Sequence, residues 1–298
     1  MRITLAGAVT GLTAGSKEIS NHLLASMLVK QTTIALLPWV AASCLAQQPP
    51  PAAEDIIRQS VQAVHEDWAK APGFDFCEVD QAGKDSRTYQ VLMVFGSPHS
   101  RLVAVNGTVL SAEMQAKEAE QLAATIRQRQ QETPEAHRRR VVQYEKERRR
   151  DQQLLEELTK AMDFTLVGSE TVNSYKTYVL DAKPRHGYAP TSVMTTVLTG
   201  MQGRLWVDQA SFRWVKVKAE VVHPVTIEGF LARVEPGTEF ELEEMPVDTP
   251  SGIWLASHFA MRARARIFWL FPKSSMQDET YFHYKANGTL SPEECEQP

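Results

Sequence analysis

The chain has 298 residues, of which 43% are hydrophobic and 23% are charged, and its formal net charge is -4. This composition is typical of a globular protein with one large core. Because nucleic-acid binding selects a broad positive field, the negative charge argues against a nucleic-acid partner.

Residues 1–46 have the pattern of a secretory signal. The apolar run at 32–42 is shorter than the roughly 20 residues that span a bilayer. Lys30 precedes this run, and small residues follow it up to an expected cleavage between Ala46 and Gln47. Met27 would make a more typical start of such a signal. We therefore expect export to the periplasm, with lipidation at Cys44, in a degenerate lipoprotein box, as the alternative.

A proline-rich linker at 47–53 leads into one domain at 54–285, with a tail at 286–298. Apolar residues at helical spacing predict an amphipathic helix over 54–70, and alternating residues predict strands over 74–80, 87–95 and 100–105.

Between residues 111 and 162 the hydrophobic period changes to that of helices. Ser111 and Thr133 are placed as N-caps, and Pro134 suits a first helical position. This predicts a long, charged helical hairpin inserted between strands, with the first part of its second helix in solvent. Two arginine triplets lie in the second helix: Arg138, Arg139, Arg140, Arg148, Arg149 and Arg150. They could contact a protein partner or lipid head groups. The simpler interpretation is that they pair with glutamates of the same helix.

After the insert the period returns to two, which predicts strands over 164–170, 175–182, 203–208, 212–220, 238–245, 253–271 and 277–284. With no helix between most of them, they should form an antiparallel sheet. We expect Glu239, Glu241 and Glu243 to face the row Arg262, Arg264 and Arg266 on the next strand, either as a cross-strand ladder or, alternatively, as an anion site.

Two cysteines remain after the expected cleavage, Cys77 and Cys295, and they could form a disulfide or stay separate thiols. The sequence has no H-E-x-x-H, Cys-x-x-Cys or G-x-S-x-G pattern. We therefore predict no metal, no cofactor and no catalytic activity.

The segment G-R-L-W-V-D at 203–208, followed by F-R-W-V-K-V-K-A-E at 212–220, resembles the central hairpin of the LolA/LolB-like lipoprotein-sorting family. It is similar in particular to exported members that carry a charged helical insert. Residues 229–233 and the strand that begins at Trp254 extend the resemblance over about 54–285.

The resemblance implies an α+β fold, in which a strongly curved antiparallel half-barrel is covered by helices and encloses an apolar cavity for acyl chains. The implied function is non-catalytic binding of lipid or lipoprotein acyl chains by a monomer. The alternative is an envelope interaction or sensing module that acts through the insert, which the minimal carrier lacks. The cavity candidates are Leu205, Trp206, Val207, Trp214, Val215, Val217, Phe240, Leu242 and Met261.

Overall fold

The computed structural model describes residues 51–227, 232–247, 252–267 and 271–297. The expected signal, its cleavage between Ala46 and Gln47, the start at Met27 and the lipidation at Cys44 lie outside these residues. Among the described helices, none combines the length and the apolar character that a membrane span requires.

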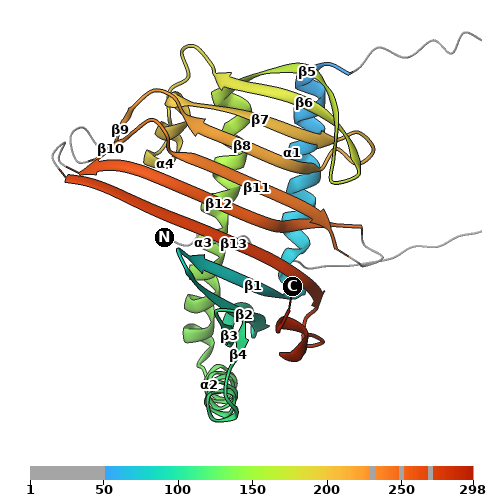
Figure 1. Ribbon diagram of the computed structural model, residues 1–298, viewed down its shortest axis with the longest axis vertical. Helices are drawn as coiled ribbons and strands as arrows, with labels where there is room; N and C mark the ends of the chain where they lie inside the picture. Colours follow the sequence, from blue (N-terminus) through green and yellow to red (C-terminus); the bar gives the residue numbers. More distant parts are fainter. Residues whose placement is uncertain (1–50, 228–231, 248–251, 268–270, 298) are drawn as a thin grey trace, which may run out of the picture. The chain divides into compact units, whose positions relative to one another are not determined.

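One antiparallel sheet of thirteen strands dominates the described part of the chain (Figure 1). Its first strands are β1 (Phe74–Ala82), β2 (Asp85–Val94), β3 (Ser97–Val105), β4 (Thr108–Val109), β5 (Met162–Val172) and β6 (Tyr175–Pro184). The others are β7 (Met201–Asp208), β8 (Trp214–Val221), β9 (Val225–Ile227), β10 (Ala232–Val234), β11 (Glu239–Pro246), β12 (Trp254–Ile267) and β13 (Phe271–Ala286).

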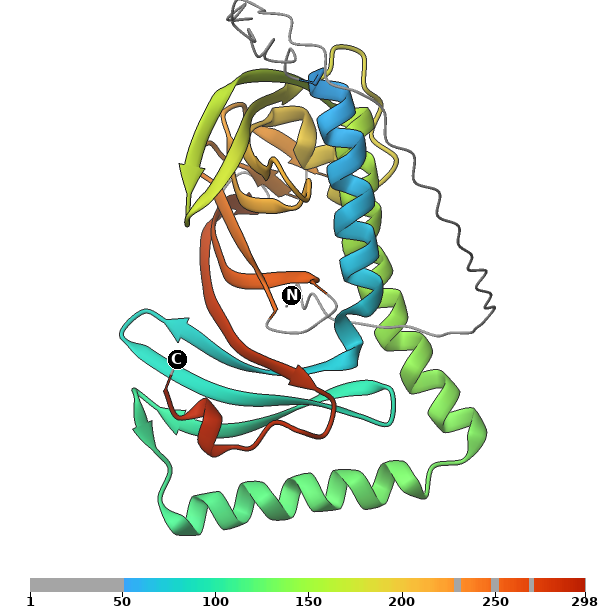
Figure 2. The ribbon, with the colours of Figure 1, turned by 90° about the vertical axis from the view of Figure 1, so that its right-hand side faces the viewer.

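The strand order is β4-β3-β2-β1-β13-β12-β11-β8-β7-β6-β5, with β9 and β10 attached beside β12. The first strand therefore pairs with the last, from Phe74 with Ala286 to Asp80 with Glu279. The sheet curves around the helices and does not close (Figure 2). The fold is thus the open, curved α+β half-barrel that the family resemblance implied.

The longer helices are α1 (Ala53–Lys70), α2 (Ala112–Gln130) and α3 (Pro134–Ala161). Short turns of helix are α4 (Val193–Thr196), η1 (Ala71–Gly73), η2 (Val197–Gly200) and η3 (Glu293–Cys295). Helices α1 and α3 contact one another and lie along one face of the sheet (Figures 1 and 2). We call this the inner face and the opposite one the outer face.

Helix α1 packs on the sheet because its buried positions recur at helical spacing: Ile56, Ser60, Val64 and Asp67 lie on one stripe. Two members of this stripe are polar. A buried polar side chain requires a hydrogen-bond partner, so Ser60 and Asp67 indicate fixed contacts between α1 and the sheet.

The insert forms α2 and α3, and both predicted N-caps are present: Ser111 Oγ accepts from the Met114 amide at 3.4 Å and Thr133 Oγ1 from the Ala136 amide at 3.2 Å. The two helices meet at a steep angle, with α2 against β3 and α3 against α1 (Figure 2). The prediction that the first part of α3 stays in solvent holds for most of its residues, which are exposed, but not for Tyr144 and Arg148, which are buried.

Two arginines fix the corner between α2 and α3 to the turn between β2 and β3. Arg129 Nη1 donates to the carbonyls of Val94 at 2.7 Å and Ser97 at 2.8 Å. Arg140 donates to Glu132 and to Ser97 Oγ, each at 2.7 Å. The insert is therefore an integral part of the fold.

The region predicted as one strand over 253–271 is two strands in the structure. β12 ends at Ile267, β13 begins at Phe271, and these two residues pair with each other. The apolar run Ile-Phe-Trp-Leu-Phe at 267–271 contains none of the glycine, asparagine or proline residues that indicate a hairpin. The sequence pattern alone therefore predicts one continuous strand here.

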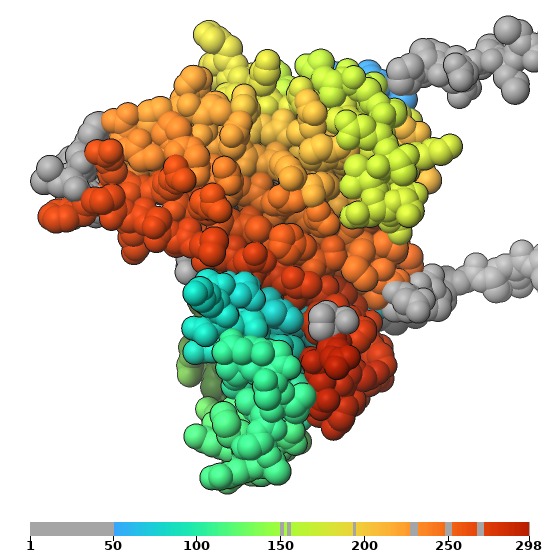
Figure 3. Space-filling view, in the orientation of Figure 1, coloured from blue at the N-terminus to red at the C-terminus, as the bar shows by residue number. Residues whose placement is uncertain are grey.

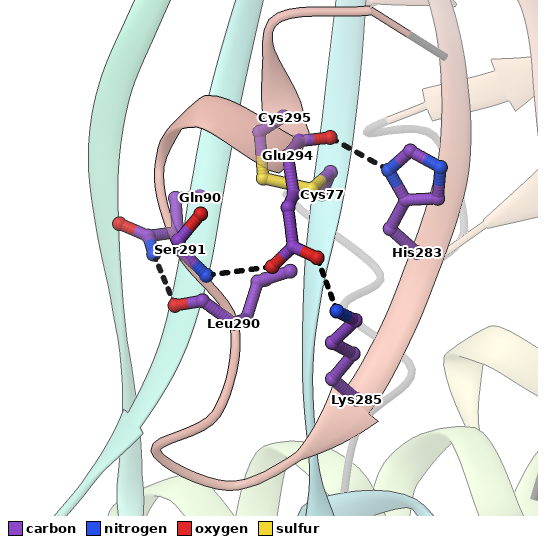
Figure 4. Close-up of a disulfide and its surroundings, with 8 residues drawn as sticks. All are labelled: Cys77, Gln90, His283, Lys285, Leu290, Ser291, Glu294 and Cys295. Carbon is purple, nitrogen blue, oxygen red and sulfur yellow. Dashed lines mark hydrogen bonds and ion pairs between the residues drawn. A yellow bond between two sulfur atoms is a disulfide. The ribbon is translucent and has the colours of Figure 1, made fainter.

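The segment after β13 folds back onto β1 and β2 instead of forming a free tail (Figure 4). Cys77 of β1 and Cys295 of η3 form a disulfide with a Cα–Cα distance of 5.3 Å. Gln90 donates to the Leu290 carbonyl at 2.8 Å, and Lys285 pairs with Glu294. Residues 286–297 thus complete a small second cluster of buried side chains.

Candidate functional site

The inner face carries a continuous apolar row across five strands. Backbone pairing aligns Leu180 with Leu205, Leu205 with Val217, Val217 with Leu242 and Leu242 with Phe259. All five are buried in the main core. Because side chains alternate between faces, the next inner row is that of Ala182, Gly203, Ala219, Phe240 and Met261.

An apolar pocket of about 50 Å³ lies where α1 and the end of α3 meet this face. Its apolar lining residues are Ile57, Val61, Leu158, Met162, Phe164, Ala182, Leu198, Met201, Leu205, Trp214, Val217 and Ala219. Pockets that hold small ligands usually measure about 300–1,000 Å³. The pocket is therefore a small gap between the helices and the sheet.

The predicted cavity residues divide into three groups. Leu205, Trp214 and Val217 line the pocket. Val207 and Leu242 are buried in the surrounding core, and Phe240 and Met261 are partly buried beside it. Trp206 and Val215 do not belong to that cluster.

The prediction that Trp206 lines the cavity is wrong, because its indole N–H donates to Glu170 Oε2 at 2.8 Å on the outer face. Trp206 follows Leu205, which lies on the inner face, so the alternation of side chains along β7 turns it outward. A β-bulge lies on the partner strand: Trp206 pairs with Lys216 and Val207 with Trp214, so Val215 of β8 is the extra residue. The bulge brings Trp214 to the inner face, where its indole donates to Ser60 Oγ at 3.2 Å. Val215 is fully buried at the bulge.

A buried ion pair holds α1 against the sheet. Arg213, just before β8, donates through Nε and Nη2 to the two carboxylate oxygens of Asp67, and the Trp254 amide donates to Asp67 Oδ2 at 3.1 Å. The Asp67 side chain is 5% exposed and that of Arg213 is 17% exposed. The same side chain thus joins α1 to both β8 and β12.

Glu244 of β11 lies beside this ion pair, in a cavity of about 30 Å³ lined also by Asp67, Trp68 and Trp254. Burial of its carboxyl group and the nearby charge of Asp67 raise the pKa of Glu244 to about 8. Arg213 opposes this shift. Glu244 is therefore largely protonated at neutral pH.

Arg148 links α1 to α3. Its Nη2 donates to the Trp68 carbonyl at 2.9 Å, its Nη1 to Glu145 at 3.0 Å, and its guanidinium lies 5.8 Å from the Trp68 ring. With Arg140 held by Glu132, two of the six predicted contact arginines serve the fold. Arg138, Arg139 and Arg149 are exposed on α3, and the side chain of Arg150 lies outside the described residues.

The outer face carries charged side chains that pair with each other. A hollow of about 560 Å³ crosses the strands. Its lining includes the charged and polar residues Asp181, Lys183, Gln202, Arg204, Lys218, Glu220, Glu239, Glu241, Arg262 and Asp278, together with Ala182, Gly203, Ala219, Phe240 and Met261 of the second apolar row. Arg204 donates to both carboxylate oxygens of Asp181, at 2.7 and 3.2 Å.

The predicted ladder between glutamates of β11 and arginines of β12 is wrong except at one rung. Glu239 pairs with Arg262 at 3.9 Å. Glu241 and Glu243 lie opposite Ala260 and His258 on β12, and they bind Lys216 of β8 instead. Arg264 and Arg266 lie beyond the part of β12 that pairs with β11.

No site was predicted at Ser60, Asp67 and Arg213, which fix α1 to the sheet, or at Glu244, which lies beside Asp67. A signal was present for the first two, because they interrupt the apolar stripe of α1. Arg213 and Glu244 carried no local signal. Within the described residues, no cluster of three or more metal-ligating side chains is present.

The curved open sheet, the two helices on its inner face and the apolar rows beneath them define an open half-barrel. Searches found no family model that matches the chain and no matching protein among curated sequences.

Among solved structures, a LolA superfamily protein from Nitrosomonas europaea matches with 12% identity over 83% of this chain and 98% of its own, at a TM-score of 0.30. A lipoprotein-sorting protein domain from Vibrio parahaemolyticus matches with 11% identity over 79% and 95%, at 0.29. The MucA/MucB complex of Pseudomonas aeruginosa matches with 11% identity over 80% and 99%, at 0.23.

Proposed function

We propose that this protein is an exported, non-catalytic binding protein that holds a lipid or lipoprotein acyl chain on the inner face of its sheet, in lipoprotein sorting or lipid transport. The observation that carries the proposal is the apolar pocket between α1, α3 and the rows of Leu205 and Ala219. An acyl chain has no groups for hydrogen bonding, so burial of its apolar surface supplies the affinity.

Binding requires that the helices separate from the sheet, because about 50 Å³ is too small for an acyl chain. Helix α1 is suited to such a movement. Its polar links to the sheet are concentrated at Ser60 and Asp67, and the rest of its contact is apolar. An acyl chain that entered would contact the same apolar side chains that α1 contacts now. The main cost in free energy would therefore be the broken hydrogen bonds and the broken ion pair of Ser60 and Asp67.

Titration with a fluorescent fatty-acid probe tests the proposal. Ala219→Phe places a large side chain in the pocket, and we expect it to weaken probe binding at least about ten-fold, which corresponds to ~1.4 kcal/mol. Trp206→Phe changes the outer face of the neighbouring strand and should leave probe binding unchanged. Equal binding by both variants, with both folded by circular dichroism, would refute an inner-face site.

A second candidate function is an interaction with an envelope protein through α3. It is favoured by the exposed face of that helix, where Arg138, Arg139 and Arg149 surround Val142, whose side chain is 52% exposed. This chemistry fits an acidic partner with an apolar side chain at its centre. Pull-down from the native envelope should lose that partner with Arg139→Glu/Val142→Asp and keep it with Ala219→Phe; the reverse result would exclude this surface.

A further inference from the structure

The β12–β13 hairpin extends beyond the strands on either side of it. Pairing of β11 with β12 ends at Glu239 with Arg262, and pairing of β1 with β13 ends at Asp80 with Glu279. Beyond these points β12 and β13 pair with each other, and β10 covers only the edge at 265–267. We call residues 262–267 and 271–276 the arm; it projects at the left of Figure 3.

The arm is strongly basic in an otherwise acidic protein. Residues 262–277 include Arg262, Arg264, Arg266 and Lys273 but no aspartate or glutamate, whereas the whole chain has a net charge of -4. The strand register places the three arginines on one face and Lys273, which pairs with Ala265, on the other. Both faces of the arm are therefore positive.

The neighbouring acids do not neutralise this charge. Glu235 binds Arg266 at 3.3 Å and Arg233 at 3.6 Å, and Glu239 binds Arg262 at 3.9 Å. The side chains of Arg262 and Arg266 remain 54% and 58% exposed. Arg264 and Lys273 are exposed too, and neither has an ion pair with another described residue.

An aromatic side chain stands at the outer end of the described arm. Phe271 is 64% exposed, more than any other large hydrophobic residue in the described part of the chain, and every residue from 271 to 276 is exposed. Aromatic rings backed by lysine and arginine are typical of segments that lie at a membrane interface, where the ring enters the head-group layer and the cations meet phosphates.

We propose that the arm docks end-on to the surface of an anionic phospholipid bilayer, with Phe271 in the interface and Arg264, Arg266 and Lys273 on lipid phosphates. The distribution of charge favours a membrane over a folded acidic protein, because a folded partner covers one face whereas a fluid head-group layer surrounds the arm. This docking does not depend on whether an acyl chain binds the inner face.

Co-sedimentation with lipid vesicles tests the proposal. The purified protein should bind vesicles that contain phosphatidylglycerol, should not bind vesicles of phosphatidylcholine alone, and should be released by high salt. Each cation near an anionic surface contributes roughly five-fold to partitioning. We therefore expect Arg264→Ser/Lys273→Ser to weaken binding roughly 25-fold, and Phe271→Ser to weaken it as well.

The matched control is Arg138→Ser/Arg139→Ser, which removes the same charge from the exposed face of α3 and should leave vesicle binding unchanged. All these side chains are exposed, so thermal unfolding should change little in any variant. Loss of binding in the α3 variant with retention in the arm variants would overturn the proposal. So would equal binding to neutral vesicles, or no binding of the unmodified protein.

Discussion

Cys77→Ser/Cys295→Ser should lower the free energy of unfolding by roughly 5 kcal/mol, because the disulfide closes a loop between residues that are 218 apart in the sequence. Loop closure limits the entropy of the unfolded chain, and this effect grows with the logarithm of loop length. The bond also holds the C-terminal segment over Val103 and Phe282, so the same variant should expose that cluster.

Urea unfolding followed by circular dichroism measures this difference. The unmodified protein in dithiothreitol should unfold at the same urea concentration as the double variant, and dithiothreitol should not affect the variant. A midpoint that changes with neither reduction nor substitution would contradict the presence of this bond in the folded protein.

The second large effect is expected at the ion pair between α1 and the sheet. Asp67→Ala should lower the free energy of unfolding by about 3–5 kcal/mol, because it leaves the buried Arg213 guanidinium without its counter-ion and the Trp254 amide without its acceptor. Asp163→Ala is the matched control. It removes an ion pair to Arg185 whose side chains are 62% and 45% exposed, and should change stability by less than about 1 kcal/mol.

Arg213→Leu combined with Asp67→Ala should recover part of the loss, because the double variant no longer buries an unpaired charge. Chemical denaturation of the three variants forms a double-mutant cycle. If the two single losses simply add, then Asp67 and Arg213 do not interact in the folded protein.

Glu244 gives this site a pH dependence with a definite sign. Its pKa is raised in the folded protein from 4.5 to about 8, so the folded state binds more protons than the unfolded state between these values. Stability should therefore fall as pH rises from about 4.5 to about 8, by an amount on the order of 3 kcal/mol, and Glu244→Gln should remove this dependence. Urea midpoints across that pH range measure it.

The sequence predicted the elements well where one physical signal decided them. The alternation of the strands, the caps at Ser111 and Thr133 and the stripe of α1 are all local. The errors arose where a contact between residues distant in sequence determines the face or the partner of a side chain. The bulge at Val215 reverses the face of Trp214, because strand periodicity alone assumes an uninterrupted pleat.

The predicted ladder between the glutamates of β11 and the arginines of β12 was wrong for a related reason. Glu241 and Glu243 can pair with either neighbouring strand, and the lysine of β8 on the other side of β11 binds them instead of the arginines of β12. The partners of Asp67 and Glu244 are likewise distant in sequence, since Arg213 lies 146 residues after Asp67. The sequence could therefore indicate that Asp67 needed a partner, but not which residue it was.

The central claim is that an acyl chain enters between α1 and the inner face of the sheet. The distance between spin labels at Gln62 of α1 and Glu220 of β8, two exposed positions, tests it most directly. Pulsed electron resonance should show one short distance without ligand, and a longer one when a fatty-acid ligand saturates the protein. An unchanged distance at full ligand occupancy would contradict the account, because the pocket of about 50 Å³ cannot hold the ligand unless α1 moves.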